Sequence, residues 1–226
     1  MTLAAGRALR IAAVMPALNE SASIAAVVRA VEPYARVIVV DDGSTDGTGE
    51  LARAAGADVV RHDINRGYDQ ALESGLQRAV ALGFDAAITL DADGQHDPSL
   101  LQRFIDALGL GADLVVGVRD RHQRWSEWLF SVVGRVLWGV HDPLCGMKGY
   151  RRELLERAGH FDSYGSVGTE LTLRAARSDC RIVEVPVPTR PRRGVSRFGG
   201  GLRANLRIVR ALMNGVLRAR ALPPRP

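Results

Sequence analysis

The stretch "AAITLDADGQHDPSLLQRFIDALG", residues 86–109, contains an apolar run, an acidic turn and a helical pattern in direct succession. Residues 86–90 are apolar apart from one threonine, and they are short enough to form a strand that is buried on both faces. Residues 97–109 carry apolar side chains at helical spacing behind an Asp-Pro pair, which is typical of a helix start. A buried strand that leads straight into a helix is the building unit of an α/β sheet.

The same unit recurs on both sides of this stretch. We predict further strands at 10–16, 36–40, 57–61 and 113–118. We predict further helices at 21–32, 45–56 and 68–83. This alternation predicts an α/β fold with a Rossmann-like, mostly parallel sheet flanked by helices. Ligands of such sheets bind beyond the carboxyl ends of the strands. The polar turns "PALNES", "DDGSTDGT" and "DADGQHDP" follow three of the strands, so we expect the chemistry there.

Length and composition limit the class of protein. The chain has 226 residues, of which 46% are hydrophobic, enough for one large domain. No run approaches the ~18 consecutive apolar residues of a membrane span. Arg7 and Arg10 interrupt the first apolar residues, so we predict no signal peptide. Cys145 and Cys180 form neither a disulfide framework nor a metal-ligand pattern, and a reducing cytoplasm is the expected location.

The basic residues are unevenly distributed. The net charge is +5, but ten of the 30 lysines and arginines lie in residues 185–226, which hold none of the 25 acidic residues, so the first 184 residues carry −5. We predict one domain over residues 1–200 and a basic amphipathic C-terminal tail over residues 201–226. One face of the tail carries Leu202, Leu206, Val209, Met213 and Val216, and another carries Arg203, Arg207, Arg210 and Arg218. Such a helix either binds an anionic membrane surface or packs on the protein with its arginines in water.

A second amphipathic segment spans residues 125–140, "WSEWLFSVVGRVLWGV". It contains all three tryptophans of the chain, Trp125, Trp128 and Trp138, and its apolar residues recur at helical spacing. Tryptophans on one helical face indicate contact with a membrane interface, and a core helix is the alternative.

Asp91 and Asp93 follow the strand at 86–90 and are two positions apart. If the strand continues, both carboxylates point to the same side and repel one another unless a divalent cation lies between them. Mg²⁺ or Mn²⁺ is typically held by one or two carboxylates together with substrate phosphates. The alternative is that these aspartates only cap turns, and this alternative is preferred for Asp97, which precedes Pro98.

A second acidic turn, Asp41 and Asp42, follows the strand at 36–40. With Gly43 and Gly47 beside it, this turn can receive the hydroxyls and base edge of a nucleoside. The sequence contains no G-x-G-x-x-G fingerprint and no P-loop motif, so neither dinucleotide oxidoreduction nor P-loop hydrolysis is supported.

Taken in order, the motifs resemble a known family. "PALNE", "VVDDGSTDGT", "NRGYDQALESG", "LDADGQHDP", "GMKGYRR", and "EVPV" followed by "RRGVSRFGG" are similar to those of family 2 glycosyltransferases of the GT-A fold, in particular the dolichyl- and polyprenyl-phosphate mannose synthases. The likeness covers residues 10–200. It departs from the family at "GMKGYRR", where relatives often have "SGFRAYRR", and at His141, and these departures concern the acceptor contacts more than donor binding.

The resemblance implies roles for particular residues. The nucleotide pocket would include Pro16, Asn19, Glu20 and Asp42, and a D-x-D-x-Q element that holds the metal and the diphosphate would consist of Asp91, Asp93 and Gln95. Arg119 matches an arginine near the phosphates, and Arg197 stands where relatives usually have a lysine that steadies them. A further family arginine has three candidates, Arg190, Arg192 and Arg193.

The resemblance further implies an inverting transfer from a nucleotide-sugar, with Mg²⁺ or Mn²⁺ as cofactor. The basic tail favours a polyprenyl phosphate acceptor and peripheral contact with the inner, cytoplasmic face of an anionic membrane. A hydroxyl acceptor on a cell-surface glycan is the alternative, and it would need a general base. Glu170, at the start of a helix predicted over 169–179, is either that base or a structural residue. A further alternative is a nucleic-acid-binding protein whose enzyme domain has lost its activity. Of these alternatives we favour the transferase, so we expect no nucleic acid partner.

Overall fold

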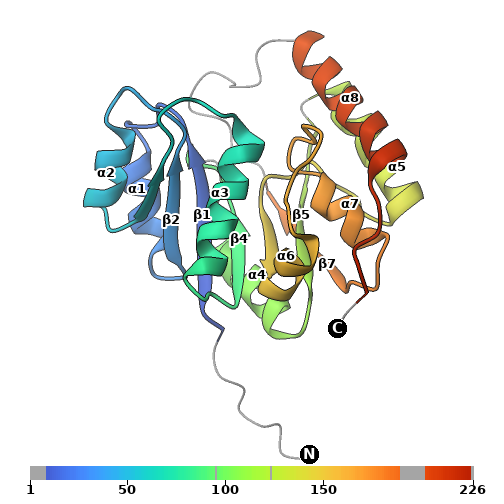
Figure 1. Ribbon diagram of the computed structural model, residues 1–226, viewed down its shortest axis with the longest axis horizontal. Helices are drawn as coiled ribbons and strands as arrows, with labels where there is room; N and C mark the ends of the chain where they lie inside the picture. Colours follow the sequence, from blue (N-terminus) through green and yellow to red (C-terminus); the bar gives the residue numbers. More distant parts are fainter. Residues whose placement is uncertain (1–8, 95, 123, 189–201, 225–226) are drawn as a thin grey trace, which may run out of the picture.

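A seven-stranded sheet forms the centre of the molecule (Figure 1). The computed structural model describes residues 9–94, 96–122, 124–188 and 202–224. In these ranges the strands lie in the order β3-β2-β1-β4-β6-β5-β7, and only β6 runs antiparallel to its neighbours. Their bounds are β1 Ile11–Ala17, β2 Arg36–Asp41, β3 Asp58–Arg61, β4 Ala86–Thr89, β5 Leu114–Arg119, β6 Lys148–Arg151 and β7 Ile182–Val187.

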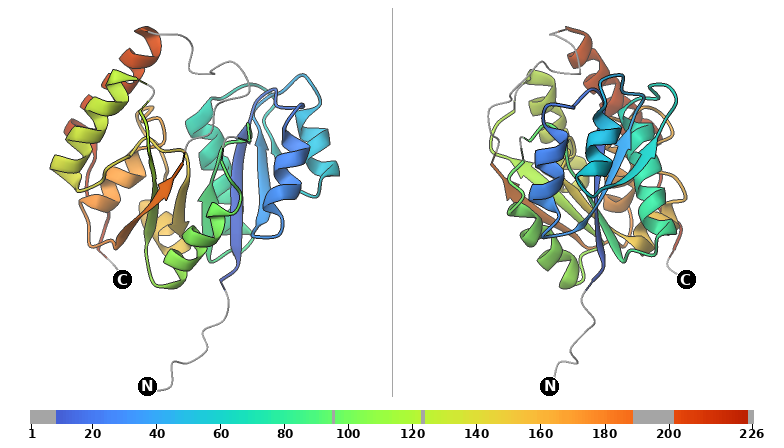
Figure 2. Two further views of the ribbon diagram at one scale, coloured as in Figure 1. Left: turned by 180° about the vertical axis from the view of Figure 1, so that it is seen from behind. Right: turned by 90° about the vertical axis from the view of Figure 1, so that its left-hand side faces the viewer.

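Helices cover both faces of the sheet (Figure 2). Helices α1, α2 and α4 contribute to the hydrophobic cluster on one face, and α3, α5, α6, α7 and α8 contribute to the cluster on the other. The helices are α1 Ile24–Val31, α2 Thr48–Ala54, α3 Tyr68–Ala81, α4 Leu100–Gly109, α5 Trp125–Trp138, α6 Arg152–Ala158, α7 Glu170–Ala176 and α8 Leu202–Arg218.

The central strand β1 is buried along its whole length. Its alternate residues belong to opposite clusters, Ala13 and Met15 to one and Ala12 and Val14 to the other, as the pleat of a strand requires. Helix α3 packs closely against the sheet at Gly75, where an added Cβ would lie 2.4 Å from Val14 Cγ1. A strand covered on both faces explains why the sequence there is uniformly apolar.

The predicted α/β fold with a mostly parallel sheet is confirmed. The five predicted strands and four helices of the first 119 residues are present, with ends that shift by up to three residues. Strand β6 was not predicted, because its sequence KGYR has neither an apolar run nor a simple alternation. It lies between β4 and β5 and brings the "GMKGYRR" segment into the middle of the sheet.

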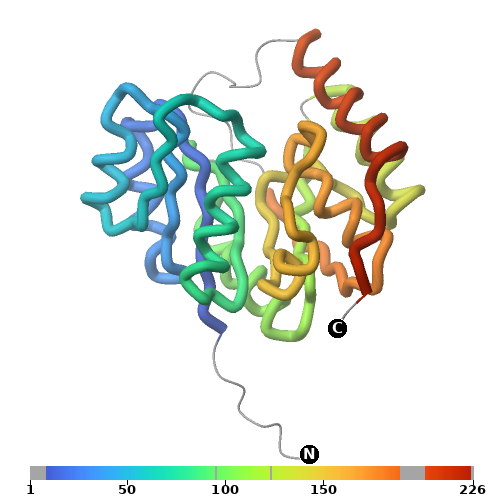
Figure 3. The backbone as a smooth tube through the Cα atoms, viewed as in Figure 1, coloured from blue at the N-terminus to red at the C-terminus, as the bar shows by residue number. Residues whose placement is uncertain are grey.

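Helix α8 packs on the body of the protein beside α5 (Figures 1 and 3). Its buried residues are mostly small: Ala204, Ile208, Ala211, Leu212 and Gly215. After the helix, the chain is held to α6 by Arg157, whose Nη2 donates to the Pro223 carbonyl oxygen at 2.6 Å. The division of the chain at residue 200 stays a prediction. Among the described residues, no helix has both the length and the apolar character needed to cross a membrane.

Candidate active site at the carboxyl end of the sheet

The loops that follow β1 and β2 are joined by hydrogen bonds between side chains and backbone. The Asn19 amide donates to Ser44 Oγ at 2.9 Å, and Asn19 Oδ1 accepts from the Thr45 amide at 3.0 Å. The Glu20 amide donates to Thr48 Oγ1 at 2.8 Å. Asn19 has a φ of 53°, a left-handed conformation that asparagine tolerates better than most residues. These contacts hold the two loops in one arrangement at the carboxyl edge of the sheet.

Asp42 lies at the centre of this arrangement and is almost fully buried. Its Oδ1 is 2.7 Å from His62 Nδ1 and accepts from the Arg66 amide at 2.9 Å, while Oδ2 accepts from the Gly67 amide at 2.8 Å. His62 Nε2 in turn lies 2.9 Å from Ser74 Oγ on α3. Asp42 therefore holds the loop between β3 and α3 against the end of β2.

The acidic turn after β4 does not continue the strand. Because β4 ends at Thr89, the alternation that would place Asp91 and Asp93 on one side does not apply to them. Both side chains are instead partly exposed on a turn around the buried Ala92. Ser23 Oγ lies 3.0 Å from the Ala92 carbonyl oxygen and 2.9 Å from Glu20 Oε2. This hydroxyl brings the acidic turn next to the loop that follows β1.

Asp91 faces a narrow space beside Gly146. A Cβ added at Gly146 would lie 3.1 Å from Asp91 Oδ2 and 3.4 Å from Tyr68 Oη, so glycine is the residue that fits there. Burial raises the pKa of Tyr68 well above its usual value, and the charge of Asp91 adds to the effect. His96 Nε2 lies 4.0 Å from Asp91 Oδ2.

The acidic turn fits a Mg²⁺ or Mn²⁺ ion. Carboxylate oxygens are the donors that these ions prefer, and Asp91 is 35% exposed and can reach a ligand. Within the described residues, no three His, Cys, Asp or Glu side chains come close enough together to hold a metal by themselves. A cation bound here would need further ligands from a diphosphate, as is usual for Mg²⁺. Gln95, the third member of the predicted element, lies outside the described residues.

Arg119 ends β5 and is held by two carboxylates. Its Nε and Nη2 donate to the two oxygens of Asp142 at 2.7 and 2.9 Å, and its Nη1 lies 3.4 Å from Glu127 Oε2 on α5. Burial alone would lower the pKa of Arg119, but the hydrogen bonds and charge of Asp142 outweigh it and raise that pKa. The guanidinium is therefore fixed in place and always charged. Arg197, like Arg190, Arg192 and Arg193, lies outside the described residues.

Glu170 begins α7, as predicted, and is 4% exposed. One of its carboxylate oxygens accepts from the Ser163 amide at 2.6 Å, and both lie 2.9 Å from Ser163 Oγ. His160 Nε2 is 3.3 Å from Oε1. A carboxylate used in this way holds the preceding loop, which supports the structural alternative for Glu170.

Comparison with known proteins agrees with this geometry. The family model described as "Glycosyl transferase family 2" matches residues 12–159. The chain belongs to this family. It is 36% identical over 212 residues to a polyprenol monophosphomannose synthase of Mycolicibacterium smegmatis, which covers 83% of this chain and 80% of the relative. It is 32% identical to an undecaprenyl-phosphate mannosyltransferase of Micrococcus luteus, over 86% of this chain and 89% of the relative.

Solved structures of glycosyltransferases share the fold. The glucosyl-3-phosphoglycerate synthase of Mycobacterium tuberculosis, in complex with Mn²⁺ and uridine-diphosphate-glucose, superposes with a TM-score of 0.72. That structure is 26% identical in sequence and covers 96% of this chain and 80% of its own. As a glycosyltransferase of family 2, this chain thus has a GT-A fold, as the sequence motifs predicted.

One buried residue of this glycosyltransferase was not assigned a role from the sequence. Lys148, at the start of β6, is 3% exposed, and its Nζ donates to the Gly168 carbonyl oxygen at 2.7 Å. Burial lowers the pKa of Lys148 to about 8. Asp69 accepts from the amide of the same Gly168 at 2.6 Å, and burial, with the nearby charge of Asp162, raises the Asp69 pKa to about 6. The available signal was that Lys148 is the only lysine of the chain, within a motif that departs from the family.

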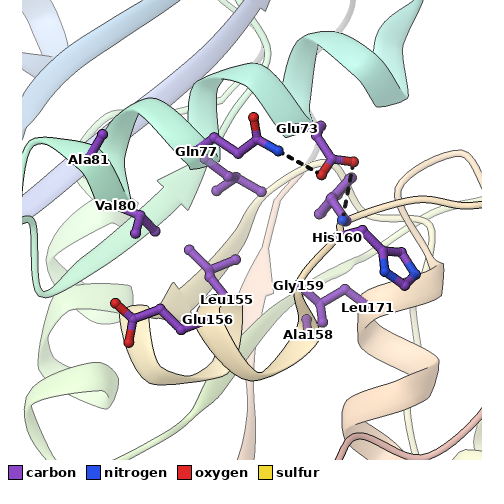
Figure 4. Close-up of a pocket in the computed structure, with 12 residues that line it drawn as sticks. Glu73, Gln77, Val80, Ala81, Leu155, Glu156, Ala158, Gly159, His160 and Leu171 are labelled. Carbon is purple, nitrogen blue, oxygen red and sulfur yellow. Dashed lines mark hydrogen bonds between the residues drawn. The ribbon is translucent and has the colours of Figure 1, made fainter.

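The glycosyltransferase also has a cavity away from these loops (Figure 4). It has a volume of about 390 Å³ and lies between α3 and α6, and none of the predicted site residues that the structure describes lines it. Glu73 is at one side, where its carboxylate accepts from the Phe161 amide at 3.2 Å. The cavity is lined mainly by aliphatic side chains, which distinguishes it from the polar carboxyl edge of the sheet.

Proposed function

We propose that this glycosyltransferase moves a monosaccharide from a nucleotide-sugar to a polyprenyl phosphate, with inversion at the anomeric carbon, at the cytoplasmic face of a membrane. The observation that carries this proposal is that the polar loops at the carboxyl edge of the sheet lie close to the helix pair α5 and α8. The polar loops at the carboxyl edge suit a nucleotide diphosphate, and the strand that ends at Arg119 leads from that edge into α5, which lies beside α8. The two mannosyltransferase relatives, named for polyprenol and undecaprenyl phosphate, support the choice of acceptor.

On the donor side, Asp91 and Asp93, with Gln95, would hold Mg²⁺ or Mn²⁺ and the diphosphate. A bound divalent cation supplies stabilisation for the negative charge that grows on the departing diphosphate. The Mn²⁺ complex of the M. tuberculosis structure supports a divalent metal in this chain.

The nucleoside would lie against the loops after β1 and β2. Asn19 and Glu20 are fixed there by the hydrogen bonds described above, and Pro16 is buried at the end of β1, where it pairs with Val40. Asp42 has three hydrogen-bonding partners and one oxygen, Oδ2, that accepts from a single amide, so it can still accept from a nucleoside. A pocket that is formed before the ligand arrives loses less entropy on binding.

An acceptor phosphate accounts for Glu170 without a catalytic base. A phosphate is already ionised near neutral pH, whereas a hydroxyl acceptor would have to lose a proton in the reaction. Glu170 would then act as a positioning residue for the loop before α7. Arg119 and Arg197 would stabilise the phosphate groups, since charge-assisted bonds from arginine are the strong ones.

An acceptor scan tests the transfer reaction. The purified chain is incubated with Mn²⁺ and each of several GDP- and UDP-sugars, and products are detected by mass spectrometry with a short prenyl phosphate, the matching prenol or a soluble glycan as acceptor. We expect product only with the prenyl phosphate, and we expect Glu170→Gln to keep part of that activity. Product with the prenol or glycan, lost in Glu170→Gln, would support the hydroxyl-acceptor alternative. Retention on DNA without transfer to any acceptor would support the nucleic-acid alternative.

The membrane contact would be made by the α5–α8 surface, which we define by its exposed apolar residues. These residues are Trp125, Trp128, Val132, Val136 and Leu137 of α5, and Leu202, Leu206, Met213, Val216 and Leu217 of α8. They include ten of the thirteen large hydrophobic side chains that are exposed in the described residues, so exposed apolar area is concentrated on one pair of helices. Exposed patches of this kind mark interaction sites.

The occupant that fits this surface is an anionic lipid bilayer. Arg203, Arg207, Arg210 and Arg218 are exposed on α8 among the apolar residues, and this helix contains no acidic residue. Each arginine near an anionic leaflet contributes about 1 kcal/mol, and inserted apolar side chains add a contribution that salt does not screen. Tryptophans such as Trp125 are favoured at the level of the lipid headgroups.

A matched pair of substitutions tests the docking surface. Leu217 on α8 and Leu110 after α4 are both 75% exposed, but only Leu217 belongs to the surface. We expect Leu217→Gln to reduce co-sedimentation with phosphatidylglycerol vesicles severalfold and Leu110→Gln to leave it unchanged. Equal loss in both variants, or none in Leu217→Gln combined with Trp128→Ser, would contradict docking by this surface. Association of the free protein into dimers that the same substitutions disrupt would indicate a second copy as the occupant.

A further inference from the structure

His96 is a buried imidazole beside the acidic turn that has no assigned role. Its side chain is 12% exposed, and both ring nitrogens are shielded from solvent. Neither nitrogen has a hydrogen-bond partner among the described residues. A buried polar atom without a hydrogen-bond partner costs about 1 to 3 kcal/mol of stability. Such an atom therefore indicates a ligand, water or ion that supplies the missing interaction.

The position of the imidazole indicates which ligand this is. His96 Nε2 lies 4.0 Å from Asp91 Oδ2, which is too long for a hydrogen bond. Two ligands that each lie about 2.1 Å from one octahedral cation are about 3.0 Å apart when they are neighbours and about 4.2 Å apart when they face one another. The separation of these two atoms is therefore one that a shared cation spans.

We propose that His96 provides an imidazole nitrogen to the divalent cation held by Asp91, and that this nitrogen makes the site favour transition metals over Mg²⁺. The inference rests on the proposed metal role of the acidic turn and extends it to the identity of the metal. Imidazole binds later first-row metals more strongly than it binds Mg²⁺, which prefers oxygen ligands. Affinity at this site should therefore increase from Mg²⁺ to Mn²⁺ to Co²⁺, and the increase should depend on His96.

The tight packing around Asp91 supports a fixed geometry. A Cβ at Gly146 would lie 3.1 Å from Asp91 Oδ2 and 3.4 Å from Tyr68 Oη, so on this side the Asp91 carboxylate has little room to move. Ligands held in place in advance bind a metal with less loss of entropy and discriminate between ions more sharply.

Pulsed electron paramagnetic resonance on the full chain tests the inference directly. Mn²⁺ is added with GDP or with UDP, and the spectrum is examined for modulation from a directly bound ¹⁴N nucleus. We expect this modulation in the wild type, its conversion to a ¹⁵N pattern in protein labelled with ¹⁵N-histidine, and its loss in His96→Ala. His141→Gln is the matched control among the five histidines, because His141 pairs with Glu184 and is half exposed.

Metal titrations supply the second measurement. We expect His96→Ala to weaken Mn²⁺ binding by about tenfold or more, to weaken Co²⁺ binding further, and to change Mg²⁺ binding least. Unchanged nitrogen modulation in His96→Ala, or equal losses for all three metals, would overturn the inference. If Mn²⁺ binds the wild type through Asp91 but no nitrogen is detected, the role of His96 fails while the proposed transferase stands. If Asp91→Asn binds Mn²⁺ as well as the wild type, the metal role of the acidic turn fails, and the inference with it.

Discussion

The loops after β1 and β2 differ from the α5–α8 surface in what their side chains contact. In the loops, polar groups bond to one another: Asp46 accepts from the Ser21 amide and from Thr48. Burial alone would raise the pKa of Asp46, but these hydrogen bonds outweigh it and lower that pKa to about 2. On the α5–α8 surface, large apolar side chains such as Trp128 and Leu206 are exposed, 57% and 68% respectively.

Under the proposed function, the two regions would bind two different kinds of ligand. A site for a small polar ligand gains from groups whose positions are fixed beforehand, because fixed donors and acceptors need no reorganisation when the ligand binds. A surface for a lipid bilayer needs no such precision, because burial of apolar area is not directional. Changes in the loops should therefore affect catalysis sharply, and changes around α8 should be tolerated more easily.

The largest effect is expected in the acidic turn. Asp93→Asn keeps the shape of the side chain but removes a charge from the proposed metal site, and it should lower the transfer rate by about a thousandfold while the fold survives. The measurement is the transfer rate with Mn²⁺, together with a thermal unfolding curve.

Asp97→Asn is the matched control, because the same chemical change is made four residues away. Asp97 Oδ1 accepts from the Ser99 amide at 3.0 Å, and an asparagine oxygen can accept the same bond. This substitution removes only a charge near the start of α4, so it should cost about 0.5 kcal/mol or less and leave the rate close to that of the wild type. Similar rates for the two variants would remove Asp93 from the site.

Arg197 should show the next largest effect. If Arg197 binds phosphate as proposed, loss of its charge-assisted hydrogen bonds in Arg197→Ala should lower kcat/KM by about a hundredfold, or about 2.7 kcal/mol. Arg197→Lys should recover part of this rate, because the charge returns without the fork-shaped donor pattern. Arg203→Ala on the exposed face of α8 should leave transfer to a water-soluble prenyl phosphate unaffected. A wild-type rate for Arg197→Ala would exclude this arginine from phosphate binding.

A pair of glycines compares the packing of α3 on the sheet with the packing beneath α8. Gly75→Ala on α3 would place a Cβ 2.4 Å from Val14 Cγ1 and 2.9 Å from Val40 Cγ2, both on buried strands. We expect a loss of about 2 kcal/mol in the free energy of unfolding, after the better helix propensity of alanine is included.

Gly215→Ala on α8 would place its Cβ 2.5 Å from Leu173 Cδ1, the terminal methyl of a buried side chain. This is one close contact where Gly75 has two, and alanine favours the helix by about 1 kcal/mol, so the net loss should be smaller than for Gly75→Ala. Urea unfolding curves measure both changes. A larger loss for Gly215→Ala than for Gly75→Ala would reverse the comparison.

The smallest effect concerns pH. The pKa of Asp69 is raised to about 6, so its contribution to stability is fully present below the unfolded value of 3.8 and is lost as the pH rises through 6. The free energy of unfolding of the wild type should therefore fall by about 1 to 2 kcal/mol between pH 4 and pH 6 because of Asp69, and Asp69→Asn should abolish this fall. The measurement is the free energy of unfolding as a function of pH.

Asp58→Asn is the comparison for this prediction, because its shift has the opposite sign. The hydrogen bond from Arg78 lowers the pKa of Asp58, so its contribution is present above pH 3.8 and is lost as the pH falls further. Asp58→Asn should lower stability by a constant amount above pH 4 and change the slope of the curve only on the acid side of pH 4. A curve for Asp69→Asn that is parallel to the wild type between pH 4 and pH 6 would contradict the assignment.

The first half of the fold could be predicted from the sequence because its signals are local. Each predicted strand up to β5 is an apolar run followed by a polar turn, and the family motifs place Asn19, Glu20 and Asp91 in those turns. The antiparallel strand β6 could not be predicted, because its burial depends on β4 and β5, which are distant in the sequence. The role of Lys148 was hidden for the same reason, since its partner Gly168 is twenty residues away.

By itself, the sequence determined the α/β alternation, the acidic turns at the strand ends and the presence of amphipathic helices in the second half, because all of these depend on neighbouring residues and on helical or strand periodicity. Only the tertiary structure decided which face of α8 is buried. The face with the larger side chains, including Leu202, Leu206 and Met213, is exposed, and the face that contains Ala204, Ala211 and Gly215 packs against the body. Small side chains allow helices to approach closely, and which face does so depends on the shape of the surface it meets rather than on hydrophobicity along the chain.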